Sequence, residues 1–139
     1  MISTNLNPTQ LNRTFLCILS AMLMAFVSGT ACVSTEYKSV RNITVDFHAT
    51  QEENVAEAQK IAHQLADSNI KTRIQSQFPA VTEQELEPLE FTQDTTLADG
   101  QWKAAVVARI TFTDQNFPAN DIMDFCYDIM KEYVEAARP

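Results

Sequence analysis

Residues 102–112 carry the pattern that most restricts how this chain can fold. Apolar side chains occupy every second position from Trp102 to Phe112, and Lys103, Arg109 and Thr111 stand between them. This alternation is typical of a strand with one buried face. The same period predicts strands over residues 42–48, 70–78 and 89–96. Four such strands need a covering layer for their apolar sides.

Two further stretches have the period of a helix. The first runs to about residue 66 and begins with a capping box, in which Thr50 and Glu53 satisfy each other's free backbone groups. The second begins near Pro118, which the first turn of a helix tolerates. Each has an apolar stripe, formed by Val55, Ala58, Ile61, Ala62, Leu65 and Ala66 in the first, and by Ile122, Phe125, Cys126, Ile129, Tyr133 and Ala137 in the second.

The expected order of elements is therefore β-α-β-β-β-α, which belongs to the α+β class. Two amphipathic helices need an apolar surface, and the alternating strands offer one. We expect an antiparallel-rich four-stranded sheet with both helices on one face, a layering that resembles the ferredoxin-like sandwich. Residues 79–88 connect two strands and hold one short helical turn capped by Thr82 and Glu85, and Asp99-Gly100 predicts the turn before the last strand.

The first 31 residues have the features of an export signal. A positive charge at Arg13 precedes a thirteen-residue apolar segment from Phe15 to Val27, and small residues follow up to Cys32. The Gly29-Thr30-Ala31-Cys32 exit resembles that of bacterial lipoproteins. This resemblance covers the N-terminal segment alone. It implies that Cys32 takes a lipid on its thiol and becomes the first residue of the mature chain.

Two other fates of this segment remain open. Signal peptidase cleavage after Ala31 would release a soluble protein, and the uncharged stretch 14–33 is long enough to stay as a membrane anchor. All three outcomes place the remainder outside the cytoplasm. We expect a lipid-anchored chain on the periplasmic side, with the outer membrane favoured over a soluble periplasmic or secreted form. The expected organisation is a signal peptide over 1–31, a tether over 32–39 and one α+β domain over 40–139.

The composition excludes several functions. The chain has 18 acidic and 10 basic residues, and loss of residues 1–31 removes one base, Arg13, and no acid, which leaves a formal side-chain charge of −9. Proteins bind the phosphate groups of nucleic acids through Lys and Arg side chains, so we expect no nucleic acid partner for this acidic chain. The two glycines of the chain, Gly29 and Gly100, are too few for a Walker A or a dinucleotide-binding loop.

Neither a catalytic site, a cofactor site nor a metal site is expected. His48 beside Asp46 and the solitary His63 are interpreted as surface residues. Asp121, Asp124, Asp128 and Glu132 lie on one side of a helix and are interpreted as a solvated face, because a straight helix cannot wrap a cation. The glutamates between positions 83 and 90 are interpreted as a solvated loop.

The sheet face away from the helices is the expected binding face, because basic side chains gather on it while the acids lie elsewhere. Its candidate residues are Thr44, His48, Lys71, Arg73, Lys103 and Arg109. The alternative is cross-strand pairing of these bases with Asp46, Glu90 and Asp94. Cys126, on the apolar stripe of the last helix, is expected to be a buried thiol near Trp102 or Ile110.

The expected function is that of a non-enzymatic binding or adaptor domain of the bacterial envelope, with a protein partner there and a membrane contact through lipid at Cys32. The alternative is an acidic inhibitor or immunity-type protein that neutralises a cationic toxin or hydrolase, because a strongly acidic protein attracts cationic partners. An enzyme ranks third, since no nucleophile–base pair or phosphate-binding loop is apparent.

Overall fold

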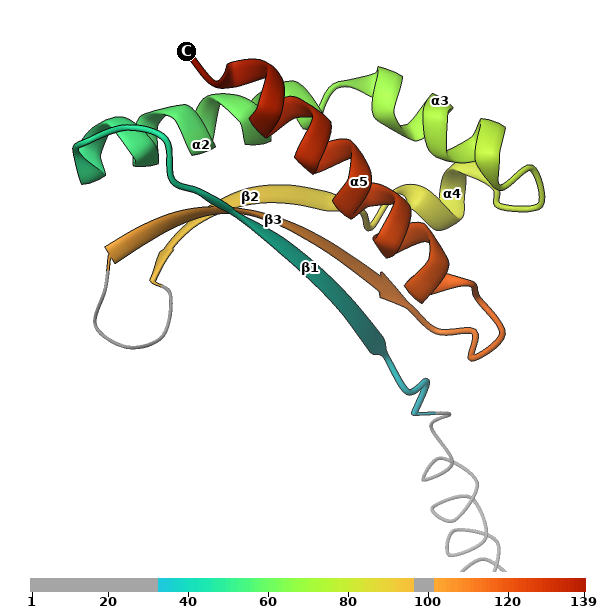
Figure 1. Ribbon diagram of the computed structural model, residues 1–139. Helices are drawn as coiled ribbons and strands as arrows, with labels where there is room; N and C mark the ends of the chain where they lie inside the picture. Colours follow the sequence, from blue (N-terminus) through green and yellow to red (C-terminus); the bar gives the residue numbers. More distant parts are fainter. Residues whose placement is uncertain (1–32, 97–101) are drawn as a thin grey trace, which may run out of the picture. The chain divides into compact units, whose positions relative to one another are not determined.

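The computed structural model describes residues 33–96 and 102–139 (Figure 1). The predicted signal segment, Cys32 and the turn expected at 98–101 lie outside the described residues. In chain order the elements are β1 (Tyr37–Val45), α2 (Gln51–Leu65), α3 (Ser68–Gln77), α4 (Glu83–Leu86), β2 (Glu90–Thr96), β3 (Trp102–Phe112) and α5 (Ala119–Ala137).

The described strands form an antiparallel sheet in the order β1-β3-β2. The central strand β3 pairs with both others, so that Val106 lies opposite Ile43 on β1 and Gln93 on β2. Helices α2 and α5 cross the same face of this sheet (Figure 1). The main core lies between the layers, where both helices pack on Val45 and on the side chains of β3 that share its face.

The predicted four-stranded sheet with two helices is wrong, although the α+β class is confirmed. The described residues form three strands and four helices, and this count does not match the ferredoxin-like arrangement. The difference arises at residues 70–78, predicted as a strand and found in α3. Ile70, Thr72 and Ile74 alternate like a strand, but Ile70, Ile74 and Phe78 also repeat every four residues, like one face of a helix.

Local contacts support the helical period in α3. Asp67 caps its start, accepting a hydrogen bond from the backbone N–H of Ser68 at 2.8 Å. The hydroxyl groups of Thr72 and Ser76 donate to backbone carbonyls four residues earlier, a contact that only a helix offers. Ile70 and Ile74 are buried at 1% and 0% exposure, while Thr72 is exposed. The buried residues of this segment are therefore four positions apart, which is the spacing of a helix.

The two long predicted helices are confirmed. Thr50 caps α2 and accepts a hydrogen bond from the backbone N–H of Glu53 at 3.3 Å. On the predicted stripe of α5, Ile122, Cys126 and Ile129 are buried at 0% exposure, and Phe125, Tyr133 and Ala137 are half-buried against the core. Pro118 stands at the N-cap of α5, one position before its first turn. Amphipathic helices of this length are well determined by sequence because their period repeats several times.

β1 begins at Tyr37, earlier than the alternation indicates, so the last three residues of the expected tether belong to the strand. The alternation does not reveal this earlier start because the first side chains of β1 that face the helices are polar. Ser39 is buried at 7% exposure, and its hydroxyl donates to Asn120 Oδ1 at 3.3 Å. Arg41 Nε donates to Asp124 Oδ1 at 2.8 Å. Polar residues of α5 therefore meet polar residues of β1.

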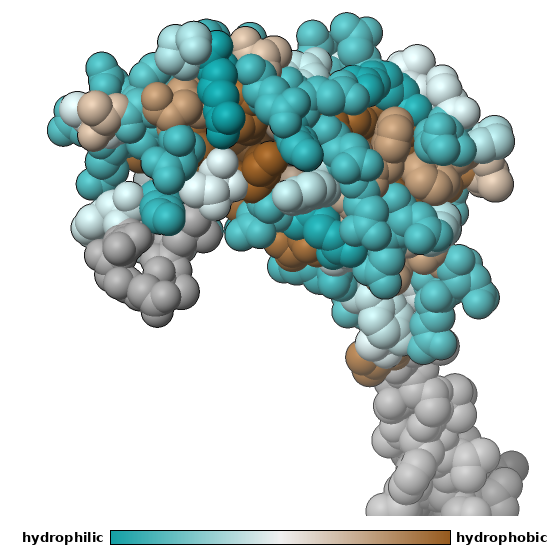
Figure 2. Space-filling model, viewed as in Figure 1, coloured by the Kyte–Doolittle hydropathy of each residue, from teal (hydrophilic) through white to brown (hydrophobic). Residues whose placement is uncertain are grey.

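The described surface is mainly polar. Figure 2 shows hydrophilic side chains over most of the view, with apolar colour confined to small areas between them. Among the described residues the exposed large hydrophobic ones include Val40 on β1, Trp102 on β3 and Tyr127 on α5, which come from three different elements. Isolated exposed apolar residues of this kind are normal for a soluble surface. The exposed apolar residues therefore do not mark a docking surface on the described part of the chain.

Candidate functional site

The predicted binding face is divided in the structure. Thr44, Lys103 and Arg109 do share the sheet face away from the helices, because Thr44 and Arg109 occupy the same side as their strand partners Ala105 and Val40. His48 follows the end of β1, and Lys71 and Arg73 belong to α3. The six residues therefore do not form one surface, and the predicted strand that joined them does not exist.

The bases of the predicted face also have partners of their own. Arg73 Nη2 lies 3.1 Å from Glu132 Oε2 and links α3 to α5 at the surface. Arg109 Nη1 donates to Thr92 Oγ1 at 3.1 Å, and Arg109 lies opposite Glu90 in the strand register. Side chains held within the sheet are less free to bind a partner. Arg109 therefore pairs across the strands with a hydroxyl group, and the salt bridges among the described residues include none between Arg109 and Asp46, Glu90 or Asp94.

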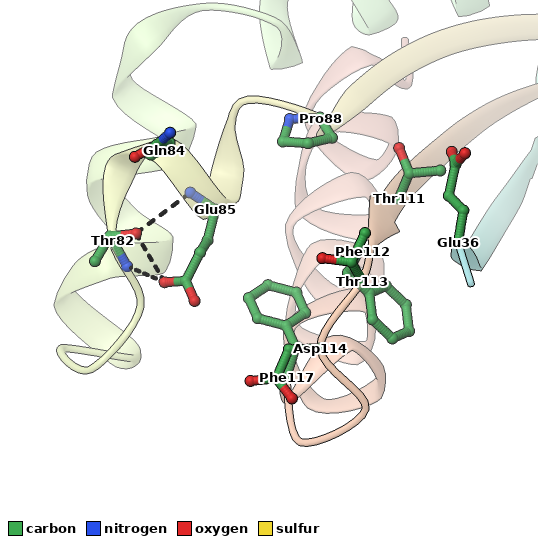
Figure 3. A pocket seen from close by; sticks show the side chains of 10 residues that line it. All are labelled: Glu36, Thr82, Gln84, Glu85, Pro88, Thr111, Phe112, Thr113, Asp114 and Phe117. Atoms are coloured by element: carbon green, nitrogen blue, oxygen red, sulfur yellow. Dashed lines mark hydrogen bonds between the residues drawn. The ribbon is translucent and has the colours of Figure 1, made fainter. Parts of the chain in front are cut away.

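A different region brings polar groups and aromatic rings together around a cavity of about 430 Å³ (Figure 3). One wall is α4 with the residues beside it, and the other is the end of β3 with the loop that leads into α5. We call this cavity the acidic pocket, and its lining residues are Glu36, Thr82, Gln84, Glu85, Pro88, Thr111, Phe112, Thr113, Asp114 and Phe117. Three carboxylates line it, and none of these described lining residues is basic.

The α4 wall is held by a capping box. The Thr82 backbone N–H and hydroxyl each donate to Glu85 Oε2 at 2.8 Å, and the Glu85 backbone N–H donates to Thr82 Oγ1 at 3.3 Å. The hydrogen bond from the Thr82 backbone, followed by that from its hydroxyl, lowers the pKa of Glu85, while the charge of Asp114 acts in the opposite direction. The Glu85 carboxylate is therefore anionic at neutral pH and close enough to Asp114 to sense its charge.

The second wall is held by a turn at Asp114. Asp114 Oδ1 accepts a hydrogen bond from the Asn116 backbone N–H at 2.9 Å, and its carbonyl accepts one from the Phe117 N–H at 3.1 Å. Asp and Asn favour such turns because their side chains bind backbone groups two residues on. The turn holds the Asp114 carboxylate and the Phe117 side chain in the cavity lining, and α5 follows directly.

A series of paired aromatic rings joins this turn to the sheet. The ring centroids of Phe112 and Phe117 are 5.6 Å apart, and those of Tyr37 and Phe112 are also 5.6 Å apart. The amide of Gln115 donates to the Tyr37 hydroxyl. Pairs in this distance range are favourable beyond the area they bury. The acidic pocket therefore has ordered aromatic rings beside its carboxylates.

The groups of the acidic pocket suit recognition of a cation. Carboxylates attract positive charge, and the faces of aromatic rings do the same through their quadrupole. Acid–base catalysis by paired carboxylates needs one pKa raised toward neutrality, and that of Glu85 is lowered. The lowered pKa keeps the Glu85 carboxyl in its charged form, which is the form that attracts a cation.

Sequence reasoning missed the acidic pocket. The acidic residues between positions 83 and 90 are exposed, as expected of a solvated segment, but the capping box fixes Glu85 in the lining of a cavity whose other side is the end of β3. The capping pattern Thr82-Glu-Gln-Glu85 and the turn residue Asp114 are both visible in the sequence, but neither indicates that the two segments lie close together. The approach of residues 82–88 to residues 111–117 is a tertiary contact, and no local pattern predicts it.

A second cavity, of about 700 Å³, lies between α2 and the end of α5 and includes His48. Its lining mixes acids such as Glu57 and Asp67 with Lys60, and Lys60 Nζ lies 3.3 Å from Glu57 Oε1. This ion pair makes the second cavity less selective for ligands of one sign of charge. Among the described side chains, no group of three or more His, Cys, Asp or Glu residues is arranged to hold a metal ion.

Cys126 is buried at 0% exposure, which confirms the expectation for this thiol. Trp102, one of its two expected neighbours, is 64% exposed at the start of β3, whereas Ile110 is in the core. Burial raises the pKa of Cys126 to about 12. The thiol is therefore neutral in the folded protein at physiological pH and is a packing residue.

The buried thiol predicts a loss of stability at alkaline pH. In the unfolded chain the thiol ionises from about pH 8.5, whereas in the folded protein it stays neutral to about pH 12. Its contribution is complete below pH 8.5 and falls by roughly 1.4 kcal/mol per pH unit above it. Urea unfolding between pH 8 and 10.5 should therefore show a steeper decline for wild type than for Cys126→Ala. Equal slopes, or fast alkylation of the folded protein, would contradict the burial.

The chain matches no protein-family model, and neither a curated protein nor a solved structure matches it. Within residues 33–96 and 102–139, no helix combines the length and apolar character needed to cross a membrane. The candidate function consequently rests on the chemistry of the domain's own residues.

Proposed function

We propose that this chain is an exported, non-enzymatic binding domain, anchored to the bacterial envelope through Cys32, that docks a cationic protein partner. The observation that carries the proposal is the acidic pocket, where Glu36, Glu85 and Asp114 line one cavity with no base among its described lining residues. The charge of −9 expected for the mature chain supports the same sign of partner, because it steers cations toward the domain.

An acidic inhibitor of a cationic toxin or hydrolase is the second candidate. The same carboxylates favour it, since an inhibitor and an adaptor recognise a basic surface by the same chemistry. The two differ in what the partner is. An inhibitor abolishes an enzymatic activity of its partner on binding, whereas an adaptor leaves any such activity intact.

One experiment in the native cell tests the anchor and the binding site together. The full chain is expressed with a photoreactive residue in place of Thr113, which lines the acidic pocket, and separately in place of His63, exposed on α2. We expect the wild-type chain to fractionate with membranes and Cys32→Ala to be released or left unprocessed. Illumination should give a discrete cross-linked protein from position 113 and not from position 63.

The outcomes separate the parts of the proposal. Processed wild-type protein in the soluble fraction would contradict the lipid anchor and leave export intact. Cross-links of equal yield from both positions, or from neither, would contradict a partner at the acidic pocket. Loss of the position-113 cross-link on adding Asp114→Asn, with retention on adding Asp128→Asn, is the specific result expected.

A further inference from the structure

Strand β2 forms one edge of the sheet, and its outer side has no partner strand among the described residues. β2 pairs with β3 alone, in a regular register from Glu90 to Asp94, and the register shifts only between Asp94 and Thr96. Alternate residues of an antiparallel strand direct both backbone hydrogen-bonding groups to the same side. Within residues 33–96 and 102–139, no backbone hydrogen bond reaches the outer side of residues 90–93. This edge can therefore accept a further strand.

A cavity of about 400 Å³ lies along this edge. It is lined by four consecutive residues, 89–92, and the side chains of Glu90 and Phe91 point to opposite faces of the sheet. The cavity therefore opens on the edge of β2 rather than on one face. Its other wall is formed by the end of α2 and the start of α3, with Leu65, Ala66, Asp67 and Lys71. We call it the edge cavity.

The two sides of this edge differ in chemistry. Phe91 lies on the side of the sheet that the helices cover, and together with Leu65 and Leu89 it gives the edge cavity an apolar lining. Glu90 and Asp94 lie on the other side, and no residue of β2 is basic. The side chains of an added strand alternate in the same way. They would meet apolar groups on one side and carboxylates on the other, which favours apolar residues alternating with basic ones.

Charge also distinguishes between the possible occupants of the edge. Two copies of β2 paired edge to edge would bring their Glu90 and Asp94 carboxylates together, and like charges opposite each other destabilise a strand pair. The outer side of β1 also lacks a partner strand among the described residues, but the charged side chains of β1 are Lys38 and Arg41. A basic segment is therefore favoured at β2 over β1.

We propose that the edge of β2 binds an extended segment of another protein, in which basic side chains alternate with apolar ones. The segment pairs with residues 90–93 through backbone hydrogen bonds, its apolar side chains enter the edge cavity, and its basic side chains lie beside Glu90. In this mode of recognition the backbone pairing supplies affinity and the alternating side chains supply specificity. The inference goes beyond the proposed function, because it requires neither the acidic pocket nor the lipid anchor.

Short peptides test the pairing on the full chain. The ¹⁵N-labelled protein, purified in a neutral detergent, is titrated with acetyl-Lys-Val-Lys-Val-Lys-amide. We expect shifts of the amide signals of residues 89–93 that saturate below about 10 mM, and slower hydrogen exchange of the β2 amides that face outward. The peptide acetyl-Glu-Val-Glu-Val-Glu-amide should bind at least about tenfold more weakly, because it reverses the charge that meets Glu90.

Methylation of the peptide nitrogens distinguishes edge pairing from simple attraction of charge. A strand directs the N–H groups of alternate residues to one neighbour, so methylation of the lysine nitrogens of the backbone and methylation of the valine nitrogens remove different sets of donors. One of these peptides should bind at least about tenfold more weakly than the parent, and the other within about threefold. Both carry the charge of the parent.

Matched variants of the protein locate the effect. Ala66→Tyr fills the edge cavity from an exposed position and should weaken the parent peptide about tenfold, whereas Ala56→Tyr, also exposed and on α2, should leave binding within about twofold. Glu90→Gln should weaken binding about threefold. Glu87→Gln makes the same charge change at an exposed residue outside the lining of the edge cavity and should have no effect.

Several results would overturn the inference. Equal binding of the two methylated peptides would show that no strand pairs with the edge, and equal effects of Ala66→Tyr and Ala56→Tyr would exclude the edge cavity. Shifts of residues 89–93 that depend on protein concentration without peptide would make a second copy of the chain the occupant. Absence of any shift up to about 20 mM peptide would remove the site. The position-113 cross-link tests the acidic pocket independently, so the two proposals can fail separately.

Discussion

Replacing Ile74 with alanine is expected to lower the free energy of unfolding by about 2–5 kcal/mol. Ile74 has 0% exposure and lies in the core cluster with Ile70, one turn earlier on α3. Alanine leaves a cavity that the surrounding helices fill incompletely, so the loss exceeds the transfer free energy of the removed groups. The change is measured as the urea dependence of the far-ultraviolet circular dichroism of the full chain.

Thr72→Ala is the matched control for this prediction. On a strand, Thr72 and Ile74 would share a face, and both substitutions would disturb the same packing. On α3, Thr72 is exposed, and alanine has the higher helix propensity, so we expect a change within about 0.5 kcal/mol. Similar large losses for both variants would contradict the helix and favour the strand that the alternation indicates.

A comparison of α2 and α3 shows when a sequence pattern alone determines whether a segment forms a helix or a strand. In α2 the helical spacing continues from Val55 to Leu65, over nearly three turns, and strand alternation does not fit it. In α3 the apolar residues are few, and Ile70 and Ile74 satisfy a period of two and a period of four equally well. The local cap at Asp67 and the contacts that α3 makes with α4 and α5 both stabilise the helix, and the spacing of the apolar residues reveals neither of them.

The predicted binding face is incomplete because one of its expected strands is a helix in the structure. The acidic pocket was not predicted for a different reason, which is the separation of its residues along the chain. The alternation in residues 70–78 predicts a strand and so puts Lys71 and Arg73 on the sheet, whereas both belong to α3. Thr44, Lys103 and Arg109 do lie on strands and share one face of the sheet, although β1 covers residues 37–45 and not 42–48. The acidic pocket joins Glu36, residues 82–88 and residues 111–117, whose separation along the chain hides their proximity.

The position of α4 depends on the apolar residues around it. Val81, Leu86 and Leu89 are buried at 6%, 0% and 6% exposure, while residues 82–85 between the first two are exposed. A helix of four residues is too short to be stable by itself. The buried side chains therefore hold α4 on the core, and in doing so they hold Thr82 and Glu85 in the lining of the acidic pocket.

Leu86→Ala should for this reason reduce both stability and binding. We expect a loss of about 2–5 kcal/mol in the free energy of unfolding, since a fully buried leucine is truncated. We also expect a lower yield of the position-113 cross-link from a protein that is still folded, because the wall that carries Glu85 loses its main attachment to the core. Urea unfolding measures the first effect, and the cross-linking experiment measures the second.

Two controls on the same helix make the Leu86 prediction specific. Gln84→Ala removes a side chain that lines the acidic pocket but is exposed, so stability should change by less than about 0.5 kcal/mol. Leu86→Met keeps the volume and should cost less than about 1.5 kcal/mol, with the position-113 cross-link retained. If Leu86→Ala lost stability but gave the position-113 cross-link at the wild-type yield, the α4 wall would not contribute to recognition. Recognition would then depend on the other wall, formed by the end of β3 and the loop that leads into α5.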